Sequence, residues 1–517
     1  MIGKFFKDKK EKIFLEKVGE KLYQISFHLQ GFSVSFRIKS RDFFLFYLKG
    51  MRRMDLEEIT RNAYRKGKSK EEILKKLKEI AKVKRRQAEL IYKEIEFSES
   101  LPQYLETHHD TFLELLTLSP TTGYTAGETG LGCRGEGDYL IHQLISKIIG
   151  ENKASSSQEI VVGATQLDDG GIVRLHKQGE LYISLAVDGI HSRLSHYPFL
   201  AGFHVARAAL RDVLAMGALP FALFSDIHLG NQGDPSKIFE YVSGISTVAD
   251  SFGVPYLCGS TLRIGGDLVG GERLTGSAGA AGLVVNPHIG KRTATRPGDL
   301  LIMTEGSGGG TITTTAIFNG FYHVVEKTMD IDFLELGRAI LTNPDILRCV
   351  HTIMDITNGG IKGDVFALSQ ATNCSVVLYK EKILSLVEPS VLKMLNSLRI
   401  DALSISIDSM LLSTPNQQSA QKLLNFIREM GYRAEVVGEI GERGEELVTL
   451  IHHDGRKEKL KMDFREAPYT PVKKMLGTAK PPDFDKMKKA LLSSVEKSIE
   501  KKKILIEYLK MKKKSKI

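Results

Sequence analysis

The chain contains few cysteines and no long apolar run. Its four cysteines lie far apart, without a Cys-x-x-Cys pair: Cys133, Cys258, Cys349 and Cys374. This spacing argues against a zinc site or a disulfide framework and favours a reducing compartment. No stretch approaches the roughly 20 apolar residues that a membrane helix needs, and charges interrupt residues 1–21 too early for a signal peptide. These absences predict a cytoplasmic protein without a membrane partner.

The common phosphate-binding and catalytic motifs are also absent. No Gly-x-Gly-x-x-Gly follows a strand, and neither His-Glu-x-x-His nor Gly-x-Ser-x-Gly occurs. The Gly-Lys-Ser at Gly67–Ser69 has Asn62 where a Walker A loop needs its first glycine. A standard nucleotide-binding loop therefore does not explain this sequence.

Basic charge is confined to the two ends of the chain. Residues 1–100 carry 26 Lys and Arg against 15 Asp and Glu, and residues 478–517 carry 13 against 5. The net charges of +11 and +8 leave −9 for residues 101–477, since the whole chain is +10. An acidic centre suits divalent cations better than nucleic acid, so we do not expect a nucleic-acid partner.

The N-terminal region divides into two parts. Residues 1–50 show little order in their pattern, and we expect a chain that begins at Met54 to be as stable and active as the full one. The alternative is an added β-hairpin, because residues 23–38 alternate in polarity around Gly31. Residues 51–97 predict a helical hairpin, whose first clear helix starts with a Ser-x-x-Glu capping box at Ser69 and Glu72.

The rest of the chain alternates strand-like and helix-like stretches. Helix 201–216 has an apolar stripe typical of a buried face, and Gly217 is expected to form its left-handed C-terminal cap. The pattern predicts two α/β (α+β) domains in tandem with helical additions at both ends. The expected segments are a basic segment (1–50), a helical hairpin (51–97), a glycine-rich loop and helix that close over a nucleotide (98–157), the two domains (158–288 and 289–450) and basic C-terminal helices (451–517).

Asp212 is a carboxylate in a helix otherwise built to pack. It lies off the apolar stripe, with no lysine or arginine three or four places downstream. Further aspartates stand in turns or at strand ends, again without matching basic residues, and each alone could be a turn former. If they converge, their repulsion is tolerable only with cations between them, and Mg²⁺ is the natural candidate. The expected metal ligands are Asp168, Asp169, Asp188, Asp212, Asp267 and Asp355.

These motifs resemble one family. The Asp168–Asp169 turn, the strand ending in Asp188 and the segment DVLAMGALP (212–220) look like the AIR synthase superfamily. The segments ATRPGDLLIMTEGSGGG (294–310) and DITNGGI (355–361) are similar to its second domain. The resemblance spans about residues 120–450.

The resemblance implies a two-domain fold with a β-barrel at a dimer interface in the first domain and an α/β second domain. It implies a homodimer that binds ATP and Mg²⁺, with Asp188 and Asp212 in catalytic roles. Asp355 would contribute from the second domain. The candidate nucleotide contacts are Gly130, Gly132, Gly135, Gly137 and Thr261.

The sequence departs from the family pattern in places. Relatives have Gly-Gly-Asp-Thr or Gly-Gly-His-Thr where this chain has Cys258–Thr261, and Ser260 cannot be an anionic ligand. Asp267 then replaces it, or fewer metal ions bind. The substrate therefore cannot be inherited from the family.

The leading hypothesis is an ATP- and Mg²⁺-dependent phosphoryl-transfer enzyme, or an ATP-activated ligase or cyclase, that acts on a small molecule. One alternative is activation similar to that of selenophosphate synthetase, with Cys133 as the reactive thiol. Arg134 stands where that pattern has a lysine, so we expect Cys133→Ser to retain most ATP turnover. Another is a non-catalytic nucleotide-binding maturation or regulatory protein.

Overall fold

The computed structural model describes most of the chain in two separate units. The first contains Met1–Leu101 with the segments Gly230–Asp234 and Ile264–Arg273, and the second contains the remainder. The residues not described are 1–11, 20–21, 30–31, 39–55, 82–84, 110, 112–121, 125, 130–134, 151–159, 163–170, 175–180, 231–232, 265–272, 357–358, 445–447, 465–478 and 515–517.

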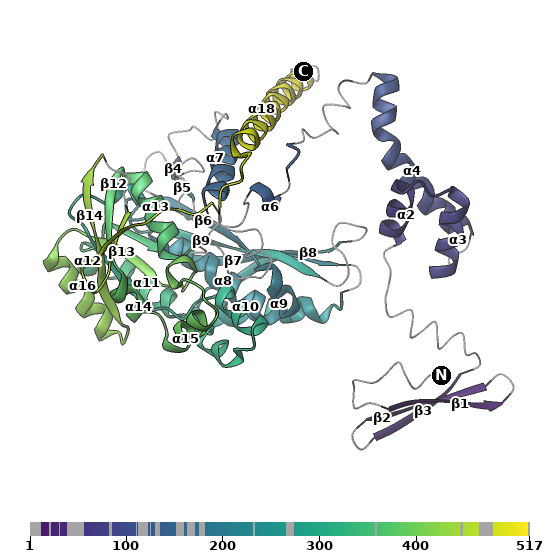
Figure 1. Cartoon of the computed structure of the whole chain (residues 1–517), viewed down its shortest axis with the longest axis horizontal. Coiled ribbons are helices and arrows are strands. Elements are labelled where there is room, and N and C mark those ends of the chain that lie inside the picture. Colours follow the sequence, from purple (N-terminus) through teal and green to yellow (C-terminus); the bar gives the residue numbers. More distant parts are fainter. Residues whose placement is uncertain are drawn as a thin grey trace. The chain divides into compact units, whose positions relative to one another are not determined.

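The N-terminal unit begins with a three-stranded antiparallel sheet. Its strands are β1 (Lys12–Gly19), β2 (Leu22–Leu29) and β3 (Phe32–Ile38) (Figure 1). Their order in the sheet is β1-β2-β3. Leu29 pairs with Phe32, so β2 and β3 are antiparallel neighbours that are consecutive in the sequence. The β-hairpin alternative is therefore the one that agrees with these strands. The polarity alternation was the signal that indicated it.

Three helices follow: α2 (Leu56–Arg65), α3 (Lys70–Ala81) and α4 (Arg85–His108), the last of which runs past the end of this unit at Leu101. The capping box is confirmed, because the Ser69 N–H donates to Glu72 Oε2 (2.9 Å) and the Glu72 N–H donates to Ser69 Oγ (3.3 Å). A small core holds the helices together, formed by Ala63, Ile73, Leu74, Leu77, Ala88 and Tyr92.

We predict that a chain starting at Met54 keeps the catalytic turnover of the full chain. The deletion removes the β1–β3 sheet, which belongs to the N-terminal unit, whereas Asp188, Asp212 and Asp355 belong to the other unit. The check is to measure ATP turnover and thermal unfolding of both chains side by side. Loss of turnover in the shortened chain would show that the sheet supports the site.

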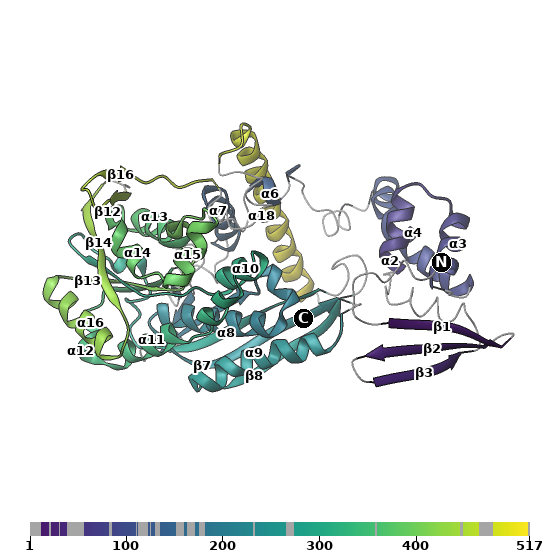
Figure 2. The ribbon, with the colours of Figure 1, turned by 60° about the horizontal axis from the view of Figure 1, so that its bottom comes forward.

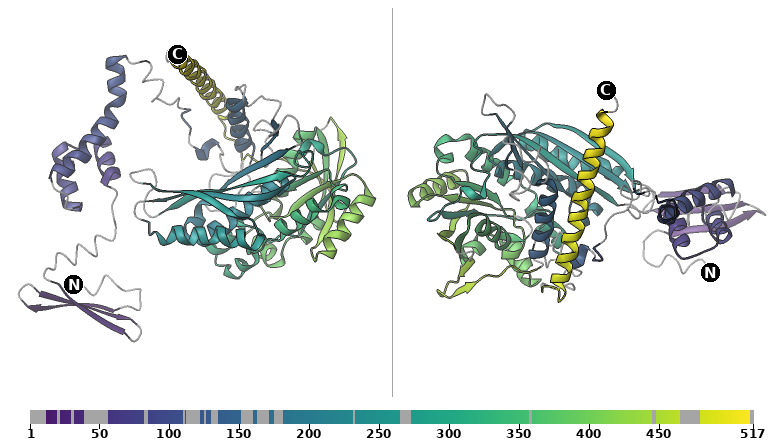
Figure 3. Two further views of the ribbon diagram at one scale, coloured as in Figure 1. Left: turned by 180° about the vertical axis from the view of Figure 1, so that it is seen from behind. Right: turned by 90° about the horizontal axis from the view of Figure 1, so that it is seen from above.

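The first domain of the larger unit is a sheet with two helices on one face. The strand order is β4-β5-β6-β9-β7-β8, and α8 and α9 pack against it (Figure 3). Gly202 and Gly244 let the two helices approach each other, since a Cβ at either would collide with the backbone of the other helix. The elements are β4 (Ile160–Val162), β5 (Gly171–Arg174), β6 (Tyr182–Gly189), α8 (Pro198–Ala215), β7 (Ala218–Gly230), α9 (Ser236–Phe252), β8 (Tyr256–Ile264) and β9 (Leu274–Val284).

The second domain is built on a seven-stranded mixed sheet of order β11-β13-β10-β14-β12-β15-β16. The β12–β15 pair is parallel, and the neighbouring β10–β13 and β10–β14 pairs are antiparallel. The two-domain α/β prediction is confirmed. The strands are β10 (Leu300–Thr304), β11 (Thr352–Asp355), β12 (Cys374–Tyr379), β13 (Met410–Thr414), β14 (Ala434–Arg443), β15 (Val448–Ile451) and β16 (Lys457–Lys459). The helices are α10 (Gly310–Phe318), α11 (Asp332–Thr342), α12 (Pro344–Leu347), α13 (Gly360–Thr372), α14 (Lys380–Ser385), α15 (Pro389–Ser397) and α16 (Gln417–Glu429).

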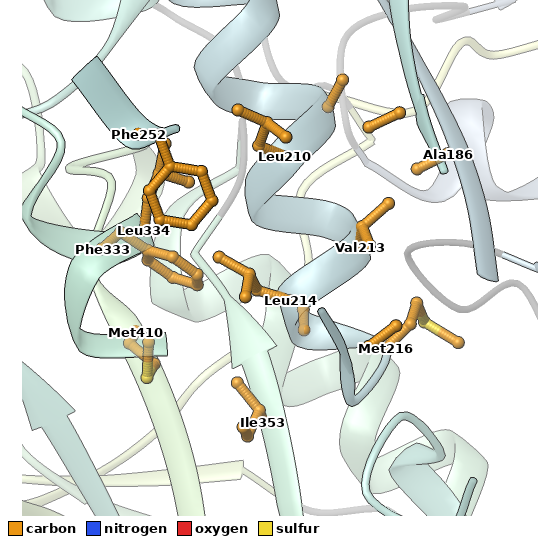
Figure 4. Close-up of a cluster of buried hydrophobic side chains, with 14 of the residues drawn as sticks. Ala186, Leu210, Val213, Leu214, Met216, Phe252, Phe333, Leu334, Ile353 and Met410 are labelled. Carbon is orange, nitrogen blue, oxygen red and sulfur yellow. The ribbon is translucent and has the colours of Figure 1, made fainter. Parts of the chain in front are cut away.

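Helix α8 lies between the two domains and is buried by both. Figure 4 shows Ala186 of β6 on one side of it, with Phe252, Phe333 and Leu334 on the other. Within residues 201–215 every residue is buried except Ala208 and Asp212, which are four positions apart and share a face. At the end of the helix Gly217 has φ +71°, so the expected left-handed cap is confirmed.

Two helices from distant parts of the sequence pack together beside these domains. They are α7 (Glu136–Gly150), which follows the short α6 (Ala126–Thr129), and α18 (Phe484–Lys514) (Figure 2). Their shared core contains Leu140, Leu144, Phe464, Met487 and Leu491. Among the described residues, no helix is both long and apolar enough to span a membrane.

Candidate functional site

The site is organised around the C-terminal half of α8. Asp212 is partly exposed, with 15% side-chain accessibility, in a helix whose other faces are covered by the two domains. Asp188 stands at the end of β6, opposite Ala278 of β9, and is also partly exposed. Its Oδ1 accepts a hydrogen bond from the Gly189 N–H at 2.8 Å. Two carboxylates of the first domain are therefore open to a ligand.

Arg211 brings further carboxylates to the same place. Its Nε lies 2.5 Å from Oδ2 of Asp355 on β11, its guanidinium contacts Asp408, and its Nη2 lies 3.6 Å from Asp212 Oδ1. Burial opposes its charge, but Asp355, Asp408, Asp212 and Asp188, in that order, hold the pKa of Arg211 well above its usual value. Four aspartates thus act on one guanidinium, and three of them were candidates from the sequence.

The expectation that the candidate aspartates lack basic partners is wrong for two of them. Asp212 and Asp355 do have a basic partner, namely Arg211, which comes directly before Asp212. Asp355 has no exposed surface, and its carboxylate faces that arginine. The available signal was a pair of arginines four positions apart in an otherwise apolar helix. Buried arginines require acidic or carbonyl partners.

Arg207, one turn before Arg211, ties the second domain to α8. It donates hydrogen bonds to the carbonyls of Gly308 (2.9 Å), Thr328 (2.9 Å) and Asp330 (2.7 Å). It also forms ion pairs with the carboxylates of Asp330 and Asp408. Asp330 and Asp408 were not predicted, because they lie in loops more than 100 residues from α8 in the sequence.

Asp408 is the central carboxylate of this network. Burial would raise its pKa, but Arg207 and Arg211 outweigh that effect and hold the pKa of Asp408 below its usual value. Its backbone has φ +62°, a conformation that costs a residue with a Cβ on the order of 1–2 kcal/mol. The ion pairs with Arg207 and Arg211 offset the cost of this backbone conformation.

A cavity of about 250 Å³ lies on the second-domain side of the network. Acidic groups line much of it, and one of them, Asp332, has its pKa raised to about 6 by burial and then by Asp330, Glu305 and Glu335. The lining residues are Thr304, Glu305, Gly306, Ser307, Lys327, Asp330, Asp332, Phe333, Leu336, Glu388, Asp408 and Tyr432.

Only some of the other predicted site residues lie in the described part of the chain. Thr261 is exposed on β8. Gly135 and Gly137 are buried, and a Cβ at either would collide with neighbouring backbone, as Gly135 would with the Phe464 carbonyl oxygen at 2.5 Å. Their small size is therefore explained by packing. Asp168, Asp169, Asp267, Gly130, Gly132 and Cys133 lie outside the described residues.

The described carboxylates differ in how well they fit Mg²⁺. Asp188 and Asp212 offer partly exposed oxygen ligands of the kind that Mg²⁺ prefers. Asp355 does not fit, because it is fully buried against a guanidinium. In the part of the chain that the structure describes, no three His, Cys, Asp or Glu residues are grouped to hold a metal ion, although half of the six predicted ligands lie outside that part.

Comparison with known proteins matches both domains to one family. The family model described as "AIR synthase related protein, N-terminal domain" matches residues 167–284, and the model of the C-terminal domain matches residues 296–451. An uncharacterised protein of Methanocaldococcus jannaschii is 39% identical over 470 residues, covering 89% of this chain and 99% of that protein.

Two more distant proteins are also similar. The selenide, water dikinase of Myxococcus xanthus is 25% identical over 256 residues, covering 48% of this chain and 69% of that protein. The crystal structure of E. coli HypE, a hydrogenase maturation protein, is 19% identical with a TM-score of 0.48, covering 64% of this chain and 99% of that chain.

Proposed function

This chain belongs to the AIR synthase-related protein family, and on that premise we propose that it is an ATP- and Mg²⁺-dependent enzyme that phosphorylates or activates a small molecule. The observation that carries the proposal is the placement of Asp188 and Asp212, two partly exposed carboxylates beside Arg211 at the junction of the two family domains. A similar protein of M. xanthus is named as a dikinase, which agrees with phosphoryl transfer.

In this proposal the first-domain carboxylates hold the metal ion. Asp188 and Asp212 are the described ligands, and Asp168, Asp169 and Asp267 remain the proposed ones outside the described residues. A bound Mg²⁺ supplies charge neutralisation for the phosphates. Asp355 has a different role in this proposal. It pairs with Arg211 and so holds in place the end of α8 that carries Asp212.

The direct test is nucleotide turnover by the full chain. ADP release would be measured with Mg²⁺ and ATP, alone and with candidate nucleophiles that include selenide, and the products would be identified by phosphorus NMR. We expect slow basal turnover that one nucleophile stimulates. If neither ATP binding nor turnover is detected in the presence of Mg²⁺, the proposal is wrong.

A homodimer is part of the same proposal. The sheet face of the first domain opposite α8 and α9 exposes large apolar side chains, which soluble monomers seldom gather in one place. They include Leu185 (49% exposed), Val187 (65%), Leu257 (65%) and Leu283 (46%). We propose that a second copy covers this face.

We predict that Leu257→Glu weakens dimerisation at least about tenfold, because a buried carboxylate would be left without a partner. The matched control is Phe239→Glu, which changes a similarly exposed side chain (67%) on α9. Light scattering after size-exclusion chromatography gives the mass of each variant. A Leu257→Glu chain that remains as dimeric as the control would contradict the proposed interface.

A further inference from the structure

The two buried arginines of α8 have different hydrogen-bond and ion-pair partners. Arg207, with 2% side-chain exposure, donates hydrogen bonds to three backbone carbonyls of the second domain and also pairs with carboxylates. Arg211, with 10% exposure, contacts carboxylates from three places: Asp355 on β11, Asp408 in the loop before β13, and its neighbour Asp212. The Arg211 guanidinium therefore supplies one positive charge to three carboxylates.

The arginines come from the first domain, and the buried carboxylates that they contact come from the second. Asp355 and Asp408 are buried carboxylates of the second domain, with side-chain exposures of 0% and 7%, and they contact Arg211 directly. Arg207 adds a second positive charge beside Asp408. The two arginines therefore face two buried second-domain carboxylates and the less buried Asp330, which pairs with Arg207. Asp188 and Asp212 of the first domain are partly exposed.

We propose that Arg211 is a built-in cation that replaces a metal ion at the second-domain side of the site. A divalent ion placed against buried Asp355 or Asp408 would meet the guanidinium in direct contact with that carboxylate and be repelled. Repulsion is weaker at Asp212, because its carboxylate is 3.6 Å from the guanidinium and is partly exposed to water, which screens the charge. The second domain then contributes no metal ligand, and any Mg²⁺ is confined to the first-domain carboxylates. Arg211 is thus a positioning residue: it binds Asp355 without a metal and so holds the part of α8 that carries Asp212. Only the Mg²⁺ part of this inference rests on the proposed function.

The first experiment measures thermal unfolding of Arg211→Gln in MgCl₂ and in NaCl of equal ionic strength. Removing the guanidinium leaves Asp355 and Asp408 short of positive charge, so a divalent ion gains a place to bind. We expect Mg²⁺ or Mn²⁺ to raise the melting temperature of this variant by more than that of the wild type. Arg211→Lys keeps the charge and should respond like the wild type.

An equal response of Arg211→Gln and the wild type would overturn the inference. If Arg211→Gln folds in neither salt, the double variant Arg211→Gln with Asp355→Asn restores the charge balance. It is expected to unfold with no more dependence on Mg²⁺ than the wild type, and a larger dependence would again contradict the built-in cation.

The second experiment counts bound Mn²⁺ by electron paramagnetic resonance in the presence of a non-hydrolysable ATP analogue. Asp355→Asn should bind as many Mn²⁺ ions per chain as the wild type, because Asp355 is not a ligand. Asp212→Asn should bind fewer. A loss of one ion in Asp355→Asn would overturn the inference. If the wild type binds no Mn²⁺ with the analogue, the proposed function fails, and the thermal experiment still decides the role of Arg211.

Discussion

Replacement of Asp212 by asparagine is expected to reduce Mg²⁺-dependent ATP turnover by about two orders of magnitude or more. Changes to groups that only support a metal ligand commonly cost about 10–100-fold, and the loss of a ligand charge should cost at least as much. Asparagine has nearly the same shape as aspartate, so the substitution tests charge rather than packing.

Folding of the Asp212→Asn chain should be close to that of the wild type. The side chain is partly exposed, and the Nη2 atom of its neighbour Arg211 is 3.6 Å away, which is longer than a direct hydrogen bond. Arg211 keeps its contacts with Asp355 and Asp408 in this variant. Thermal unfolding and circular dichroism give the stability and fold, and initial rates of ADP release give the turnover.

The matched control is Asp250→Asn, a similar change at an exposed position on the other helix of the same domain. It should leave both turnover and melting temperature unchanged. Two results would refute the metal-ligand role of Asp212: a variant that turns over ATP at the wild-type rate, or one that no longer folds.

The sequence predicted the parts of this fold that depend on local pattern. The buried stripe of α8, the cap at Gly217 and the capping box before α3 all arise from residues within one or two turns of each other. Asp212 stood out for the same reason, since its face of the helix is defined by its immediate neighbours. The structure shows that face to be the partly exposed one.

The ion network could not be predicted in the same way, because its members meet only after folding. Arg207 and Asp408 are separated by 201 positions, and Arg211 and Asp355 by 144. Each aspartate alone is typical of a turn or a strand end. Helical spacing suggests basic partners three or four places away, whereas Arg211 is directly before Asp212 and contacts it within the folded site. Buried arginines on a packed helix are the signal that would have found the network.

The largest loss of stability is expected for Asp408→Asn. The change leaves Arg207 and Arg211 buried with one negative charge fewer between them, and breaking a buried ion pair typically costs about 3–5 kcal/mol. For a large domain this corresponds to a fall in melting temperature on the order of 10 °C. Asp330→Asn is the comparison, because Asp330 has 30% side-chain exposure and should matter less.

The effect of Asp408→Asn should also depend on pH in a defined direction. The pKa of Asp408 is lowered in the folded chain, so its charge stabilises the fold at pH values above the unfolded pKa of about 3.9. That contribution is lost as the pH falls through the lower folded pKa. The difference in melting temperature between wild type and variant should therefore stay constant from about pH 7 to pH 5 and shrink below about pH 4. A difference that stays the same down to pH 3, or a variant as stable as the wild type at neutral pH, would show that the arginines do not depend on the charge of Asp408.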